Sequence, residues 1–105
     1  MAIQLGSVLL DACVLAVVMR EDTYGYKLTQ EVKQIMDVSE STLYPVLRRL
    51  QQSGCLTVYD KPFQGRNRRY YAITPAGRAH LQEMLATYHQ FFQGVNDILA
   101  GKEDP

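Results

Sequence analysis

The last quarter of the chain constrains the fold most. Apolar residues in it are spaced four, three, four, three and four apart, which is the repeat of a helix that packs along its whole length. Thr74-Pro75 and Gly101 bound this helix at about 26 residues, or about 39 Å. One small core cannot cover it, so we expect a second copy of the chain, or the first helix folded back, to cover its far end. The expected interface residues are Leu81, Met84, Leu85, Tyr88, Phe91, Phe92, Val95, Ile98 and Leu99.

Two shorter helices are predicted at the start of the chain. Residues 7–20 are apolar nearly all round, so we expect a buried helix with Ser7 as its N-cap. Residues 24–36 form the next helix, capped by Asp22 or Thr23. Its apolar residues recur three and four apart, as one buried face requires. They are Tyr24, Leu28, Val32, Ile35 and Met36.

A third helix and a hairpin follow. The helix runs to about Ser53, and Ser41 suits its N-cap better than Ser39 because Pro45 then falls in the first turn. We expect Gly54 to end the helix. Two β-prone stretches flank a loop over residues 60–68, which is longer than a tight turn, so we expect its tip to project and be mobile. The stretches are Leu56–Tyr59 and Arg69–Ile73.

The element order predicts a mostly α fold with a small β-hairpin, a winged helix-turn-helix followed by a long dimerisation helix. We expect residues 1–73 to form the DNA-binding part and residues 74–105 the dimerisation helix and a short tail, in one compact domain. The apolar share of 47% is enough for a core.

The net charge of zero hides an uneven distribution. Residues 41–78 carry seven basic side chains against Asp60 alone, whereas residues 1–40 and 79–105 are each acidic by three charges. Such a layout favours a polyanion-binding face on an otherwise acidic protein. An unevenly charged, solvated surface is the alternative that composition leaves open.

The start of the third helix and the hairpin carry the residue types that contact DNA. Hydroxyl groups suit phosphates or base edges, and arginines neutralise phosphates. One of Ser39 and Ser41 is favoured to act only as the helix cap. The alternative for Tyr44 is a place in the core, and the alternative for Arg49 is an ion pair with an acidic residue. Because Arg68 and Arg69 point to opposite faces of a strand, one of them is structural. The DNA-contact candidates are Ser39, Ser41, Thr42, Tyr44, Arg48, Arg49, Arg66 and Arg68.

Other chemistry finds little support in the sequence. No nucleophile–base pair or metal set is visible, so we expect no enzyme, no catalytic residue, no metal and no cofactor; His80 and His89 lie on opposite sides of their helix. Cys13 is expected to be a small core residue, while Cys55 is a candidate accessible thiol without the flanking cation of a redox sensor. The longest apolar run is too short to span a bilayer, and two unpaired cysteines fit the cytoplasm.

Three blocks together resemble the PadR family of bacterial transcriptional regulators, over roughly residues 8–85. The blocks are Tyr24–Leu28, Ser41–Leu50 and Gly65–Gly77. The resemblance implies a dimeric winged-helix repressor in which the helix from Ser41 to Arg49 reads DNA and the wing contacts it. It also implies release from DNA by a small hydrophobic or aromatic effector.

Some compact members of the family use a tryptophan in the last helix to stack on a planar drug. This chain contains no tryptophan, so the resemblance does not extend to that mode of drug binding. The resemblance alone favours a repressor over an activator. Two other classes remain as alternatives: a winged-helix protein-interaction module, and a small-molecule-binding protein without DNA affinity.

Overall fold

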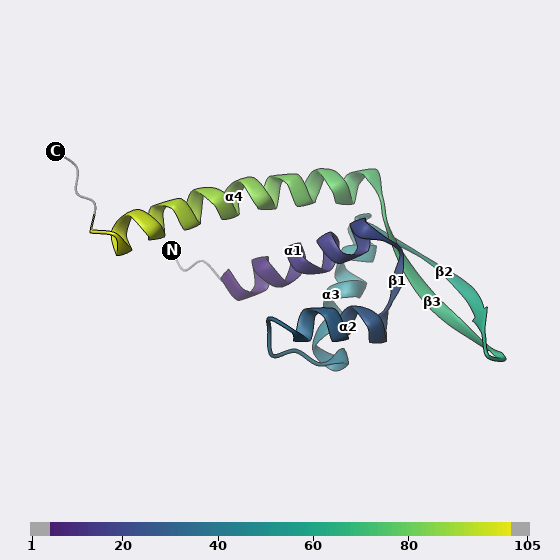
Figure 1. Ribbon diagram of the computed structural model, residues 1–105. Helices are drawn as coiled ribbons and strands as arrows, with labels where there is room; N and C mark the ends of the chain where they lie inside the picture. Colours follow the sequence, from purple (N-terminus) through teal and green to yellow (C-terminus); the bar gives the residue numbers. More distant parts are fainter. Residues whose placement is uncertain (1–4, 102–105) are drawn as a thin grey trace.

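The computed structural model describes residues 5–101, with side chains from Ser7 onward. Over this range the helix α4 lies along α1, α2 and α3 lie on the other side of α1, and the hairpin projects from one end (Figure 1). The mostly helical winged-helix fold is thus confirmed, and none of these helices is long and apolar enough to cross a membrane. The elements are α1 (Leu5–Arg20), β1 (Thr23–Tyr24), α2 (Gly25–Lys33), α3 (Glu40–Gln52), β2 (Leu56–Phe63), β3 (Arg66–Ile73) and α4 (Pro75–Leu99).

The helix α1 is central, but only one side of it is buried. Val14, Leu15 and Val18 have exposed fractions of 0–1% and meet residues of the other helices and the sheet in the core. Its opposite side is less covered: Ala12 and Cys13 are half-buried, and Val8 is exposed. The expectation that all of α1 is buried is therefore wrong, because the described elements of a single chain cover one face of it.

The starts of α1 and α2 differ from the prediction. Ser7 lies inside α1, which already includes Leu5 and Gly6, rather than capping it. Neither Asp22 nor Thr23 caps α2. Instead Thr23 and Tyr24 form the short strand β1, which pairs with β3. Tyr24 is the N-cap residue of α2 and makes no side-chain capping bond.

The end of α2 also differs. The helix stops at Lys33, earlier than predicted, so Ile35 lies beyond it and is 72% exposed. Leu28 and Val32 of the predicted face are buried as expected.

The helix α3 begins earlier than predicted. Ser39, not Ser41, is its N-cap, and the Ser39 hydroxyl accepts a hydrogen bond from the Thr42 amide at 3.3 Å. Pro45 consequently lies inside the helix and lacks the N–H that would bond to the Ser41 carbonyl. Pro45 is exposed, so water can reach that carbonyl. The predicted stop at Gly54, with φ of 85°, is confirmed.

The hairpin is longer and tighter than predicted. Its strands run to Phe63 and from Arg66, so the expected loop over residues 60–68 shrinks to Gln64-Gly65. Both turn residues have positive φ, 52° and 78°, which matches the right-handed twist of the strands. The three strands form an antiparallel sheet in the order β1-β3-β2.

The helix α4 begins as predicted and ends at Leu99, with Thr74 as N-cap, Pro75 in the first turn and Gly101 after the C-cap. A Cβ at Gly77 would overlap the Cys55 carbonyl oxygen, so only glycine fits there. The first half of α4 belongs to the core of its own chain: Leu81 is 1% exposed and Met84 9%. These two are therefore corrected from interface residues to core residues.

Candidate nucleic-acid interface

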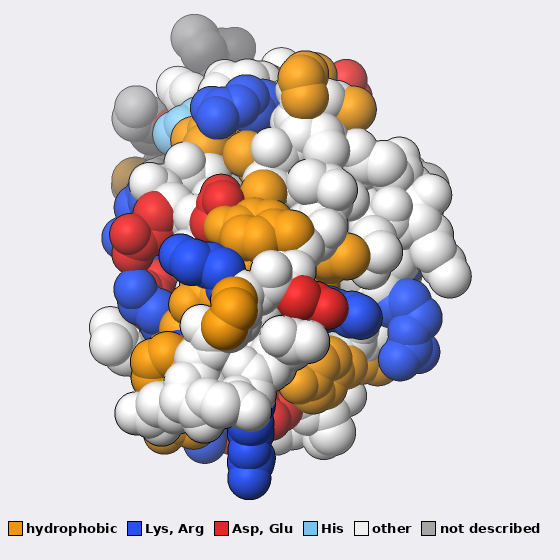
Figure 2. Space-filling model, turned by 90° about the vertical axis from the view of Figure 1, so that its right-hand side faces the viewer, with side chains coloured by type: hydrophobic (Ala, Val, Ile, Leu, Met, Phe, Trp, Pro, Cys, Tyr) orange, Lys and Arg blue, Asp and Glu red, His pale blue; other side chains and the backbone are white. Residues whose placement is uncertain are grey.

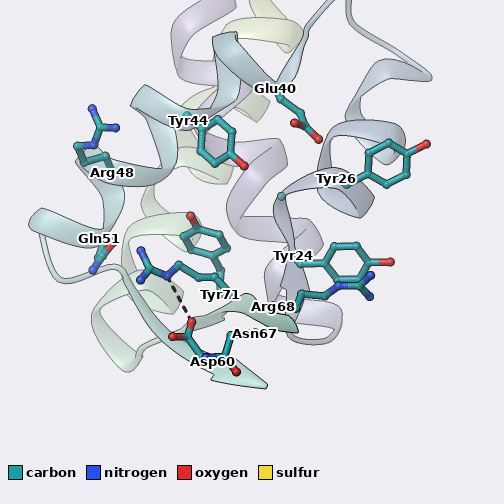
Figure 3. Close-up of a pocket in the computed structure, with 12 residues that line it drawn as sticks. Tyr24, Tyr26, Glu40, Tyr44, Arg48, Gln51, Asp60, Asn67, Arg68 and Tyr71 are labelled. Carbon is teal, nitrogen blue, oxygen red and sulfur yellow. Dashed lines mark ion pairs between the residues drawn. The ribbon is translucent and has the colours of Figure 1, made fainter. Parts of the chain in front are cut away.

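A cleft of about 640 Å³ lies between the outer face of α3 and the hairpin. Side chains from α3, β1, β2 and β3 and from the start of α2 surround it (Figure 3). The lining residues are Tyr24, Gly25, Tyr26, Glu40, Tyr44, Arg48, Gln51, Asp60, Asn67, Arg68, Arg69 and Tyr71.

The helix α3 presents Tyr44, Arg48 and Gln51 to the cleft. Their spacing of four and three places them on one helical face. The opposite face carries the buried residues, so packing of α3 on the core turns this polar face outward. The buried residues are Leu43, Val46, Leu47 and Leu50.

The hairpin contributes Asn67 and Arg69 from β3 and Asp60 from β2. Asp60 lies opposite Arg69 in the strand register, and the Arg69 Nε is 3.5 Å from the Asp60 Oδ1 (dashed in Figure 3). Both side chains are about half exposed, so the pair is weak and the guanidinium can turn to an incoming phosphate.

Tyrosines form the floor of the cleft. Tyr71 rises from β3 toward Tyr44 of α3 (Figure 3), and burial is the main cause that raises the pKa of the Tyr71 phenol. A Cβ at Gly25 would lie 3.3 Å from the Tyr44 hydroxyl. The glycine therefore lets α2 approach the ring of Tyr44, whose side chain remains 45% exposed and is not a core residue.

Two hairpin arginines have different surroundings. The Arg68 Cζ lies 3.9 Å from the Tyr24 ring centroid and 3.5 Å from that of Phe63, so its guanidinium is held between two rings. Arg66 is exposed beside the turn, opposite Phe63. The structure thus gives Arg68 a packing role and leaves Arg66 available at the tip.

The hydroxyl residues cluster at the start of α3, as the sequence suggested. Ser39 Oγ lies 2.9 Å from Ser41 Oγ and 3.1 Å from Thr42 Oγ1, and all three residues are exposed. Ser39 caps the helix, and the other two hydroxyls remain at the surface near the positive end of the helix dipole.

Arg49 takes the alternative role. Its guanidinium donates two hydrogen bonds to the Asp11 carboxylate of α1, at 2.9 and 2.8 Å, and this bonding raises the pKa of Arg49. The ion pair joins α3 to α1, and its Asp11 partner is buried. We therefore remove Arg49 from the DNA-contact candidates. Cys55 is 6% exposed, so the accessible-thiol expectation for it is also wrong.

The sequence reasoning missed Gln51, Asn67 and Arg69. Gln51 follows Arg48 by three residues and was detectable from helical spacing. Asn67 fell in the expected loop, where the face of a side chain is not fixed. Of the pair Arg68 and Arg69, the sequence favoured Arg68 for DNA, whereas in the structure Arg68 packs between two rings and Arg69 lines the cleft.

The electrostatic character of this end is mixed. Seen from the hairpin end, separated Lys and Arg side chains lie among hydrophobic and acidic ones (Figure 2). Among residues 5–101, no group of three or more His, Cys, Asp or Glu side chains is placed to hold a metal ion. Arginine, tyrosine and amide side chains beside an exposed helix match what DNA backbones and base edges require.

Known proteins share this architecture. The chain is 33% identical to smu.1704 of Streptococcus mutans, whose crystal structure matches 100% of this chain and 99% of that one with a TM-score of 0.88. A transcriptional regulator of Mycobacterium tuberculosis, Rv3488, is 46% identical over 63 residues, 59% of each chain. Bacillus subtilis PadR, solved in complex with operator DNA, shares the fold at 23% identity and a TM-score of 0.67, over 73% of this chain and 46% of that one.

The family match covers the helix-turn-helix, the hairpin and the start of α4. The model of the transcriptional regulator PadR-like family matches residues 14–83, a span that includes every residue lining the cleft. Together with the winged-helix fold, this match shows that the chain belongs to the PadR-like family of transcriptional regulators.

Proposed function

We propose that the chain is a sequence-specific DNA-binding repressor that acts as a homodimer on a near-palindromic operator. The observation that carries the proposal is the cleft: it aligns Tyr44, Arg48 and Gln51 of α3 with Arg69 of the hairpin on one exposed surface. In this arrangement α3 reads the major groove, while the hairpin, with Arg66 at its tip, contacts the backbone. Ser41 and Thr42 bind a phosphate at the start of α3.

Apolar side chains at the end of α4 support the homodimer. Ile98 is 77% exposed and Leu99 78%, and the outer side of α1 is half-exposed as well. Large exposed apolar side chains at the end of one helix and on the uncovered side of another suit an interface between two copies. Of the described residues, 74–101 then form the dimerisation part and 5–73 the DNA-binding part; the remaining ends of the predicted ranges, 1–4 and 102–105, lie outside the described residues.

A small hydrophobic or aromatic effector would bind along α4. Tyr88 and Phe92 have ring centroids 4.4 Å apart, and the centroids of Phe91 and Phe92 are 5.7 Å apart. These half-buried rings are the aromatic surface that the dimer would present to a planar ligand. If such a ligand releases the protein from DNA, the chain is a regulator that responds to that ligand. Its place of action is then the cytoplasm, where the DNA lies.

DNA binding is tested by selection of bound duplexes from a random pool, followed by fluorescence anisotropy of the selected and shuffled duplexes at two salt concentrations. We expect an inverted repeat with half-sites about 10 base pairs apart or a multiple of that. Arg66→Ala should lower affinity and the salt slope, whereas Arg78→Ala, which removes a charge from α4, should leave both unchanged. No enriched sequence would refute the specific regulator and favour a protein-interaction or ligand-binding module.

The homodimer is tested by sedimentation equilibrium. Leu99→Asp should yield a monomer, because a carboxylate cannot be buried without a partner. Gln93→Asp, an exposed position on the same helix, is the matched control. A wild-type chain that sediments as a monomer would refute the dimer.

A further inference from the structure

The outer half of the hairpin has no third strand beside it. β1 pairs with β3 only at Thr23–Tyr71 and Tyr24–Tyr70, whereas the pairing of β2 with β3 continues to Phe63–Arg66. Two-stranded ribbons twist strongly and are marginally stable alone. Backbone pairing alone therefore only weakly fixes the angle between the hairpin tip, where Arg66 lies, and the rest of the protein.

A row of stacked side chains runs along one face of the hairpin. The rings of Tyr59 and Tyr70 stack with centroids 5.6 Å apart and an interplanar angle of 11°, and the edge contact of Tyr70 with Tyr24 has a centroid distance of 5.5 Å. Arg68 continues the row from Tyr24 to Phe63, next to the turn. The row thus connects the base of the hairpin with its tip.

The row ends in a hydrogen bond to the body of the protein. The Tyr59 hydroxyl donates to the Asp22 carboxylate at 2.6 Å, and this bond is the main cause that raises the pKa of Tyr59. Asp22 lies in the turn between α1 and β1, and the adjacent Glu21 pairs with Lys27 of α2 at 2.8 Å. The hairpin is therefore tied to the helix-turn-helix through side chains as well as through β1.

We propose that Tyr59 is a positioning residue for DNA binding, which fixes the hairpin tip relative to α3 by holding Asp22 and stacking on Tyr70. This inference rests on the DNA-binding function proposed above. Tyr59 itself touches no DNA in this arrangement. It places Arg66, and the Asp22–Tyr59 contact sets how far the tip can swing from the face of α3 that carries Arg48.

The test uses Tyr59→Phe, which keeps the stacked ring and removes the hydroxyl. Affinity for the selected duplex should fall about two- to tenfold, as expected for one lost hydrogen bond. Hydrogen exchange of the amides of Lys61 and of residues 63–68 should accelerate, while the melting temperature stays close to that of the wild type because the bond is exposed. Tyr70→Phe, which also keeps its ring in the row, is the matched control and should change neither affinity nor exchange.

A double-mutant cycle identifies positioning. If Tyr59 places Arg66, Arg66→Ala should cost less affinity in the Tyr59→Phe background than in the wild type. Asp22→Ala should reproduce Tyr59→Phe without adding to it, and Asp22→Asn, which keeps an acceptor oxygen, should restore part of the affinity.

Two results overturn the inference and are distinguishable. Additive losses of DNA affinity in Tyr59→Phe and Arg66→Ala, or unchanged amide hydrogen exchange at the hairpin tip in Tyr59→Phe, would refute the positioning role. The DNA-binding function would still stand if Arg48→Ala lowered the affinity. A wild-type chain without affinity for any duplex would refute the proposed function and the inference with it.

Discussion

Arg48 and Arg49 are neighbours on α3, yet they have different surroundings. Arg48 is exposed and lines the cleft, whereas Arg49 donates two hydrogen bonds to the buried Asp11. A step of about 100° around a helix is enough to separate a side chain that faces solvent from one that holds two helices together. The comparison teaches that charge on a helix predicts function only after the packed face is known.

The largest effect is expected on the packed face. Leu47 is 1% exposed, and Leu47→Ala should lower the free energy of unfolding by about 2–5 kcal/mol, because it leaves a cavity in the core. Urea denaturation measures the loss. The exposed Gln52→Ala on the same helix should stay within about 0.5 kcal/mol. Equal effects at the two sites would break the distinction between the faces.

Arg49→Ala should cost less, about 1–2 kcal/mol of unfolding free energy. The substitution leaves the Asp11 carboxylate, 12% exposed, without its partner, but the Arg49 side chain is itself 53% exposed and partly screened. DNA binding, measured by anisotropy where the variant is folded, should keep its salt slope. A reduced slope would instead return Arg49 to the DNA-contact surface.

Arg48→Ala should lower DNA affinity and leave stability unchanged, the reverse of Arg49→Ala. We expect stability within about 0.5 kcal/mol of the wild type, since an exposed side chain is removed. Affinity for the selected duplex should fall about tenfold, and affinity for the shuffled duplex much less, because a base contact in the major groove is lost. Anisotropy with the two duplexes measures both affinities, with Arg78→Ala as the control. Full affinity in Arg48→Ala would contradict the assignment of the cleft.

The smallest effect is expected at the contact between α2 and α3. In Gly25→Ala the new methyl meets the Tyr44 hydroxyl, which can shift into the open cleft, so stability should change by less than about 0.5 kcal/mol. The displaced ring should lower DNA affinity about twofold, roughly 0.4 kcal/mol. Gly25→Ala in a Tyr44→Phe background should not lower DNA affinity further. An equal loss of affinity in that background would show that the effect of Gly25→Ala does not act through Tyr44.

The sequence predicted best where the signal was local. The α4 start at Thr74-Pro75 and the stop at Gly54 depend on hydrogen bonds within a few residues, such as that from the Gly77 amide to the Thr74 hydroxyl at 3.0 Å. The buried stripe of α3 followed from helical spacing in the same way. The cleft residues Tyr44 and Arg48 were found because their helix was found.

The predictions failed where distant segments meet. The strand β1 exists because Thr23 and Tyr24 pair with residues almost fifty positions later in the chain. The exposure of Ile35 and the burial of Leu81 likewise depend on which element covers which, whereas the ion pair of Arg49 with an acidic residue was one of two predicted alternatives. Residue-by-residue patterns carry no information on such neighbours.

From the sequence alone follow the winged-helix order of elements, the caps of α4, the resemblance to one family and the basic central segment. These depend on spacing and on interactions between residues close in the chain. The tertiary structure decided which arginines line the cleft, that the hairpin turns within two residues, and that Tyr59 reaches Asp22. The physical reason is that packing and strand register bring together side chains that the sequence holds far apart.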